Sequence, residues 1–118
     1  MNFIEVAFRI LVAHSIGDFA LQSPVMAKYK SPKNKVPKEM YNKGQKAEPM
    51  WFYYLTSHAL ILGACIWMVS GDWKWGVIEA VFHWVIDFGK CNNKYGVKID
   101  QALHMVSRIP AFIWMLWS

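Results

Sequence analysis

The chain has 118 residues, of which 55% are hydrophobic and 16% aromatic, and its formal net charge is +5. A single domain of this length cannot bury so much apolar material in its own core. The composition therefore disfavours an ordinary soluble domain. The two cysteines, Cys65 and Cys91, are widely separated, which disfavours a disulfide framework or a cysteine-rich zinc site.

Four apolar runs predict four transmembrane helices in one membrane domain that covers residues 1–118. The runs extend over about residues 3–22, 50–70, 75–89 and 99–118. We therefore expect an all-α fold, a four-helix transmembrane bundle with a long basic cytoplasmic loop.

The first run is expected to remain in the mature protein. It has no basic segment before it, contains Glu5, Arg9 and Asp18, and offers no cleavage signal of small residues, so a removed signal peptide is not predicted. Glu5 and Arg9 are one helical turn apart and are expected to neutralise each other. The second run is the clearest span, because residues 50–70 contain no charge and are long enough to cross about 30 Å of hydrocarbon.

Residues 23–49 connect the first two runs and are expected to form a surface loop. They hold four prolines, one glycine and seven lysines against two glutamates, a composition that breaks regular structure. Ten of the thirteen lysines and arginines lie either in this loop or in residues 89–98. The positive-inside rule then predicts that both loops are cytoplasmic and that both termini lie on the opposite side of the membrane.

These lysines admit two interpretations. Clustered lysines can neutralise the phosphates of nucleic acids, or they can orient a membrane protein and attract anionic lipid headgroups. Because the lysines lie beside the predicted spans, we favour the second interpretation. Membrane lipid is therefore an expected partner, and nucleic acid is not.

Histidine and aspartate recur at a helical spacing. All four histidines lie inside the predicted helices, and three of them have an aspartate four positions away. The pairs are His14 with Asp18, His83 with Asp87, and His104 with Asp100, whereas His58 has no such partner. Residues four apart share one face of a helix, so each pair directs two potential metal ligands the same way.

The seven side chains are also expected to lie at one depth. Counted from the cytoplasmic end of each helix, they fall within about 3 to 12 Å of one interface. Aspartates in apolar helices cost up to about 2.5–3.5 kcal/mol each at mid-membrane unless they find partners, and a shared cation removes most of that cost. We therefore predict a divalent metal site, with zinc favoured and iron, manganese or nickel also suitable. Its predicted ligands are His14, Asp18, His58, His83, Asp87, Asp100 and His104.

Structural explanations of the same residues remain open. A single membrane histidine such as His58 is often a hydrogen-bonded packing residue, and each His/Asp pair can be a structural couple. His104 and Arg108 also have pairing spacing on a helix. Glu79 lies one turn before His83 and is a weaker candidate for a base, because it is nearer the outer half of its helix. Neither a nucleophile elbow nor a glycine-rich phosphate loop occurs in the sequence.

Three motifs follow one another along the chain: HSIGDFALQ at residues 14–22, HWVIDFGK at 83–90 and DQALH at 100–104. Their order and spacing resemble those of a family of small bacterial and phage membrane proteins of unassigned function. The resemblance covers nearly the whole chain except the lysine-rich loop. It implies a bacterial inner membrane, with both termini in the periplasm. The pattern is also loosely similar to inner-membrane metal-dependent hydrolases, which place histidine and aspartate at helix ends.

These observations predict a membrane-embedded, metal-dependent hydrolase that acts at the cytoplasmic headgroup layer on a lipid phosphoester. A bound metal ion would lower the pKa of its water toward neutrality, and one aspartate would serve as general base. The catalytic candidates are Asp18, Asp87 and Asp100, and the candidate headgroup contacts are Gln22, Lys90 and Gln101.

The main alternative is a non-catalytic membrane protein, stabilised by metal, that acts by binding another membrane protein or a second copy of itself. A pore-forming role is disfavoured, because a simple lesion-forming protein has no need for four histidines at one depth.

Overall fold

The computed structural model describes residues 1–46 and 48–118. The described residues form helices and loops and contain no β-strand. The prediction of an all-α chain is therefore confirmed. One helix among the described residues is long and apolar enough to cross a membrane by length and composition. The structure thus confirms the helical class, whereas the four membrane spans stay a prediction.

The first predicted run folds as helix α1 (Phe3–Ser15), continued by the π-helical turn η1 (Ile16–Ala20). Asn2 caps the start of α1 by accepting a hydrogen bond from the Glu5 backbone N–H. Within η1, Gly17 packs directly on Leu62, since an added Cβ would lie 2.6 Å from Leu62 Cδ1. Single π-turns occur often at functional sites, and this one carries Asp18.

The lysine-rich segment contains more regular structure than expected. Helix α2 (Pro24–Tyr29) begins at Ser23, whose hydroxyl accepts from the Met26 N–H, and Pro24 occupies its first turn. A short 3₁₀ turn, η2 (Lys38–Met40), follows. The Ser-Pro pair is a known helix-start signal, but the surrounding prolines and lysines hid it at the sequence level.

Helices α3 (Trp51–Ser70) and α4 (Trp73–Cys91) form an antiparallel pair around a tight turn. Gly71 ends α3 in the left-handed conformation (φ 79°), and Asp72 caps α4 by accepting from the Lys74 N–H. The two backbones touch where the helices cross, because a Cβ added to Gly76 would lie 2.7 Å from the Gly63 carbonyl oxygen. Small residues permit such close approach between helices.

The last run is divided into α5 (Val97–Ser107) and α6 (Ile109–Trp117), rather than forming one continuous helix. The division falls at Arg108, two residues before Pro110. Proline lacks an N–H and its ring clashes with the carbonyl four residues earlier, which breaks the helical hydrogen-bond pattern. The break turns Arg108 into the interior, where it is 2% exposed.

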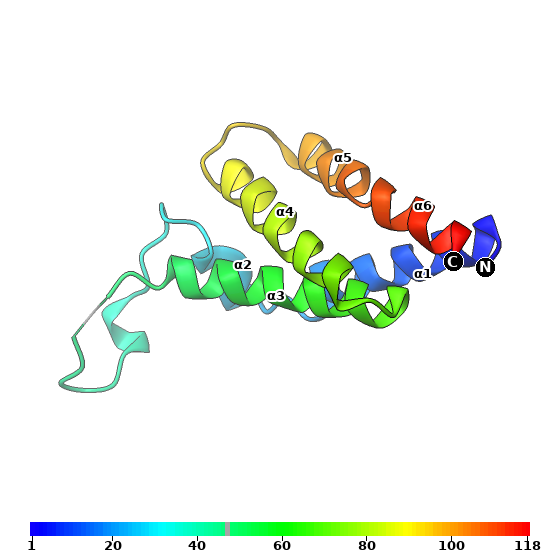
Figure 1. Cartoon of the computed structure of the whole chain (residues 1–118). Helices are drawn as coiled ribbons and strands as arrows, with labels where there is room; N and C mark the ends of the chain where they lie inside the picture. Colours follow the sequence, from blue (N-terminus) through cyan, green and yellow to red (C-terminus); the bar gives the residue numbers. More distant parts are fainter. Residues whose placement is uncertain (47) are drawn as a thin grey trace.

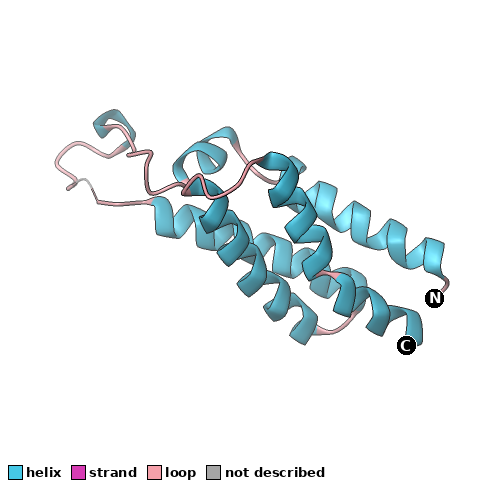
Figure 2. Ribbon diagram, turned by 90° about the horizontal axis from the view of Figure 1, so that it is seen from above, coloured by secondary structure: helices cyan, strands magenta, loops and turns pink. Residues whose placement is uncertain are grey.

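The helices run side by side in an elongated bundle (Figures 1 and 2). The N- and C-termini lie together at one end, near the turn between α3 and α4, and the lysine-rich segment projects from the opposite end, on the side of the α4–α5 loop (Figure 1). At the end with the termini, Val6, Ile10 and Met115 form an apolar core that Phe112 and Leu116 flank.

The interior of the bundle is as polar as it is apolar. Among the described residues, eleven hydrophobic residues and eleven polar or charged residues are buried, whereas many large hydrophobic side chains, such as Phe8, Leu60 and Val81, are half or more exposed. A soluble protein shows the reverse distribution. The molecule is therefore ionic inside and apolar outside.

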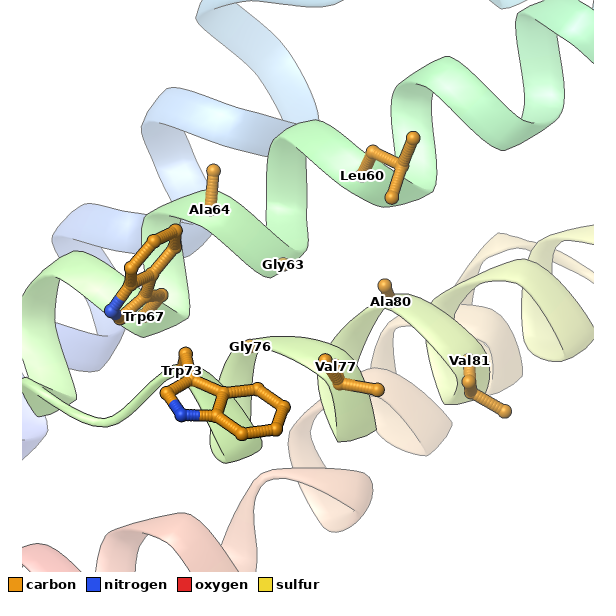
Figure 3. A pocket seen from close by; sticks show the side chains of 9 residues that line it. All are labelled: Leu60, Gly63, Ala64, Trp67, Trp73, Gly76, Val77, Ala80 and Val81. Carbon is orange, nitrogen blue, oxygen red and sulfur yellow. The ribbon is translucent and has the colours of Figure 1, made fainter.

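An apolar cavity of about 650 Å³ lies on the outer side of the α3–α4 pair. Figure 3 shows Gly63 and Ala64 of α3 opposite Gly76 and Ala80 of α4, with the indole rings of α3 and α4 at one end. No residue that lines it has a titratable side chain. The cavity is thus distinct from the ionic interior.

Candidate metal centre

The seven predicted ligands converge in the interior. They come from α1, η1, α3, α4 and α5, and none is more than 6% exposed. We call them the His/Asp cluster: His14, Asp18, His58, His83, Asp87, Asp100 and His104. A continuous chain of contacts of 3.7 Å or less between imidazole nitrogens and carboxylate oxygens links all seven. Two triads within it can hold a metal ion, Asp18–His58–His83 and His83–Asp87–His104.

Two imidazole nitrogens of the cluster each lie close to the same two carboxylate oxygens. The Nε2 atom of His58 lies 3.1 Å from Asp18 Oδ1 and 3.5 Å from Asp87 Oδ2. The Nε2 atom of His83 lies 3.7 Å and 3.5 Å from the same two oxygens. A tetrahedral ion with bonds of about 2.0–2.1 Å separates its ligand atoms by about 3.3–3.4 Å. The four distances bracket that value.

Hydrogen bonding alone leaves this arrangement incomplete. The distances of 3.5 and 3.7 Å from His83 Nε2 are too long for good hydrogen bonds. That nitrogen is buried and has no hydrogen-bond partner among the described residues. Buried polar atoms normally have partners, so a ligand between these atoms would satisfy His83. The residues present fit a divalent cation.

Asp87 also contacts a second group of donors. Its Oδ1 atom lies 3.3 Å from His104 Nε2, and that nitrogen lies 3.2 Å from Asp100 Oδ1. The rings of His83 and His104 stack with centroids 4.1 Å apart. The carboxylate of Asp87 is thus central to the whole cluster.

Glu79 and Arg108 form a buried ion pair beside the cluster. Three nitrogen–oxygen contacts of 2.7–3.1 Å join the guanidinium to the carboxylate. The sequence-based pairing of Arg108 with His104 is therefore wrong, because the helix break at Pro110 turns Arg108 toward α4. Glu79 Oε1 also lies 3.5 Å from His83 Nδ1. A carboxylate at this nitrogen favours the tautomer whose Nε2 is free to bind metal. The exposed Glu5–Arg9 pair, in contrast, forms as expected, at 3.1 Å.

His14 has protein partners at both ring nitrogens. Arg108 Nη1 lies 2.6 Å from Nδ1, and because a guanidinium can only donate, Nδ1 must accept. The proton then resides on Nε2, which donates to Gln101 Oε1 at 2.8 Å. The geometry gives His14 the role of orienting Gln101, and its metal-binding role stays a prediction.

Lys30 was missed at the sequence level. It lies just after α2 and is 6% exposed, and its Nζ donates to Asp87 Oδ2 at 2.8 Å and to Gln22 Oε1 at 2.7 Å. Only the Ser-Pro start of α2 hinted at an ordered segment here. Nothing in the sequence distinguishes Lys30 from the neighbouring surface lysines.

The three predicted headgroup contacts lie around the cluster. Gln101 Nε2 donates to Asp100 Oδ2 at 3.1 Å and to Asp18 Oδ2 at 3.3 Å. Gln22 Nε2 donates to the Asp18 carbonyl, which anchors it beside η1. Lys90 Nζ lies 3.7 Å from Asp100 Oδ2, and its side chain is 34% exposed. All three side chains are partly exposed.

Tyr95, in the loop between α4 and α5, covers the same end of the cluster. Its hydroxyl donates to the Ile86 carbonyl, and its ring packs on Gly89, where an added Cβ would lie 2.5 Å from the hydroxyl oxygen. Burial first, and then the negative charges of Asp100 and Asp87, raise the pKa of the Tyr95 phenol. The phenol therefore remains protonated and holds the loop over the end of α4.

Comparison with known proteins assigns the chain to a family but to no activity. A family model described as a protein of unknown function (DUF3307) matches residues 6–118. The chain belongs to this family. No curated protein and no solved structure matches it. The motif resemblance and the likeness to metal-dependent hydrolases therefore stay predictions.

Proposed function

We propose that this member of the DUF3307 family is a multi-pass inner-membrane protein that hydrolyses a lipid phosphoester with a divalent metal held by the His/Asp cluster. The observation that carries the proposal is the set of buried donor atoms of His58, His83, Asp18 and Asp87, whose imidazole nitrogens and carboxylate oxygens lie 3.1–3.7 Å apart inside an apolar-surfaced bundle. Each part of the proposal rests on a separate feature.

The membrane location is supported by the apolar outer surface. The 20 residues of α3 cover about 30 Å at the usual helical rise, and many large hydrophobic side chains on the other helices face outward. Lipid covers such a surface without the cost of exposing it to water. Four crossings by α1–η1, α3, α4 and α5–α6 bring both termini to one side, which is the periplasm under the positive-inside rule.

The position of the cluster supports a substrate at the cytoplasmic headgroups. Asp18 lies in η1, just before the lysine-rich segment, Asp87 lies four residues before the end of α4, and Asp100 is the fourth residue of α5. These carboxylates are therefore near the helix ends that adjoin the lysine-rich segment and the α4–α5 loop. Lys30 and Lys90 bring positive charge to this end of the site, and lysine is a common phosphate ligand. A phosphate-bearing lipid headgroup matches both the depth and the charge.

The chemistry requires a nucleophile, a proton acceptor and an acceptor of negative charge. A divalent ion bound here would supply hydroxide at neutral pH by lowering the pKa of its water. Hydrolysis forms a bond from that oxygen to phosphorus, breaks the P–O bond to the alcohol, and leaves the alcohol oxygen protonated. The carboxylates of Asp18, Asp87 and Asp100 hold the positive charge and provide the proton acceptor, while Gln101 and Lys90 orient the phosphate.

The test is metal analysis and hydrolysis with matched variants. Wild-type protein, purified in detergent, is expected to contain a stoichiometric divalent transition metal and to release phosphate or alcohol from vesicles that contain phospholipid. Asp87→Asn is expected to lose both, whereas Glu39→Gln, at an exposed site on η2, keeps both. Wild-type protein without metal, or an Asp87→Asn variant with unchanged metal and activity, contradicts the proposal.

A second function is favoured by the two buried cations. Lys30 pairs with Asp87, and Arg108 pairs with Glu79, so part of the acidic charge is neutralised without a metal ion. In this case the cluster is a structural element of a membrane protein that acts by binding another membrane protein. Thermal stability that falls on chelation, with no hydrolysis of any phospholipid tested, identifies this second function.

A further inference from the structure

The two oxygens of the Asp87 carboxylate face different donor sets. Oδ2 lies 3.5 Å from Nε2 of both His58 and His83. Oδ1 lies 3.3 Å from Nε2 of His104. A carboxylate with one oxygen in each of two donor sets is suited to bridge two metal ions, which in dinuclear hydrolases lie about 3.5–4 Å apart.

A second donor set lies on the other side of Asp87. It consists of Asp87 Oδ1, His104 Nε2 and Asp100 Oδ1, with contacts of 3.2 and 3.3 Å through His104. These contacts match the spacing of ligand atoms around an ion with bonds of about 2.0–2.2 Å. Asp100 is 1% exposed, and its Oδ1 atom has no hydrogen-bond partner among the described residues. An unsatisfied, buried carboxylate oxygen aimed at an imidazole nitrogen needs a further partner.

The ring of His104 is also left incomplete by contacts within the chain. His104 is fully buried, and its Nδ1 atom has no hydrogen-bond partner among the described residues. Buried polar atoms normally have partners, so His104 and Asp100 Oδ1 mark the same unfilled place.

The local charges also favour a cation on this side of Asp87. Lys30 places its ammonium 2.8 Å from Oδ2, the oxygen of the first donor set. Lys90, which is a third exposed, lies 3.7 Å from Asp100 Oδ2, whereas His104 contacts Asp100 Oδ1. The two lysines thus contact the carboxylate oxygens opposite those that contact His104.

We propose that the His/Asp cluster is a dinuclear centre, in which Asp87 bridges one cation held with Asp18, His58 and His83 and a second cation held by Asp100 and His104. This inference rests on the metal site of the proposed function and extends it. Two ions at such a distance can stabilise both the attacking and the leaving oxygen of a phosphoester. A phosphate ester, the substrate class of the proposed function, is one of the substrates that such a two-metal site can cleave.

The experiment counts metal ions with manganese(II) as the probe. Protein purified in detergent is stripped with a chelator, dialysed and titrated with manganese, and bound ions are counted by elemental analysis and followed by electron paramagnetic resonance. Wild-type protein is expected to bind two ions per chain and to show the spectrum of a spin-coupled pair. Asp100→Asn and His104→Ala are each expected to bind one ion per chain, with an uncoupled spectrum.

Controls separate the loss of a ligand from the loss of the fold. Glu39→Gln is expected to bind two ions, as wild type does, and Asp100→Glu, which keeps a carboxylate, retains the coupled spectrum. Circular dichroism and size-exclusion chromatography identify any variant that has unfolded. If either Asp100→Asn or His104→Ala unfolds, the metal count of the other, folded variant tests the dinuclear centre. One ion per chain in wild-type protein, or two in a folded Asp100→Asn or His104→Ala variant, overturns the dinuclear centre.

The outcome for the dinuclear centre is independent of the outcome for catalysis. Two coupled ions without hydrolysis of any phospholipid uphold the dinuclear centre and refute the hydrolase. One ion per chain together with phospholipid hydrolysis upholds the hydrolase and refutes the dinuclear centre.

Discussion

The two ends of the bundle fill their interiors in opposite ways. At the end with the termini, Val6, Ile10 and Met115 pack as an ordinary apolar core. At the other end, imidazoles and carboxylates occupy the same kind of space between the helices. Replacing buried ionic groups with apolar ones is often neutral or stabilising, so stability alone does not explain the second end. The comparison between the two ends can be tested from both sides.

The largest effect is expected from breaking the ion pair at the edge of the cluster. Glu79→Leu leaves the guanidinium of Arg108 buried without its counter-charge, and we expect the free energy of unfolding to fall by about 3–5 kcal/mol. Thermal unfolding in detergent measures the loss. The double variant Glu79→Leu/Arg108→Leu should recover most of it, and a single variant as stable as wild type would show that the pair is not coupled to folding.

A similar loss of stability without a loss of metal is expected at the apolar end. Met115 is fully buried, and truncation to alanine removes its contacts and leaves a cavity, at a cost of about 2–5 kcal/mol. The metal content of the folded Met115→Ala variant should match that of wild type by elemental analysis. A variant that loses metal would mean that the two ends are not independent.

An intermediate effect is expected where α3 and α4 touch. A valine at position 76 places its Cβ 2.7 Å from the Gly63 carbonyl oxygen and 2.9 Å from Trp67 Cβ, so Gly76→Val forces the helices apart at a cost of about 1–3 kcal/mol. Because His58 and His83 lie on these two helices, metal affinity should fall as well, as a metal titration would show. Gly96→Ala is the control, because nothing lies within 4 Å of its added Cβ. Equal stability and equal metal affinity in the two variants would contradict the prediction.

The smallest effect is expected at the surface. The side chains of Glu5 and Arg9 are 45% and 44% exposed, and such pairs contribute about 0–1 kcal/mol. Glu5→Gln should therefore shift the unfolding midpoint only slightly, and any shift should shrink in high salt. A loss comparable to that of Glu79→Leu would show that the contrast between surface and interior pairs does not hold.

The composition and spacing of residues were enough to predict the helical class and the membership of the cluster. Apolar runs of about 20 residues predict helices, and a spacing of four predicts that His83 and Asp87 share a face. The structure places these two side chains 3.5 Å apart. A rule of this kind depends only on the regular geometry of one helix, so it can be applied without knowledge of the other helices.

The partners of the cluster could not be found in this way. Lys30 reaches Asp87 across 57 positions of sequence, and Arg108 reaches Glu79 across 29. The π-turn at Asp18 also depends on how the helices pack, and the break at Arg108 depends on Pro110. Long-range pairs of this kind arise from the arrangement of helices, for which the local pattern carries no signal.

The sequence by itself determined that the chain is helical, apolar on its outside and supplied with histidine and aspartate on matching helix faces, because these properties follow from residue type and helical period. Only the tertiary structure decided which nitrogen faces which oxygen, that His14 is held by Arg108 and Gln101, and that Asp87 stands between two donor sets. Those relations require the rotation and crossing of four separate helices, which side-chain packing fixes only when the chain has folded.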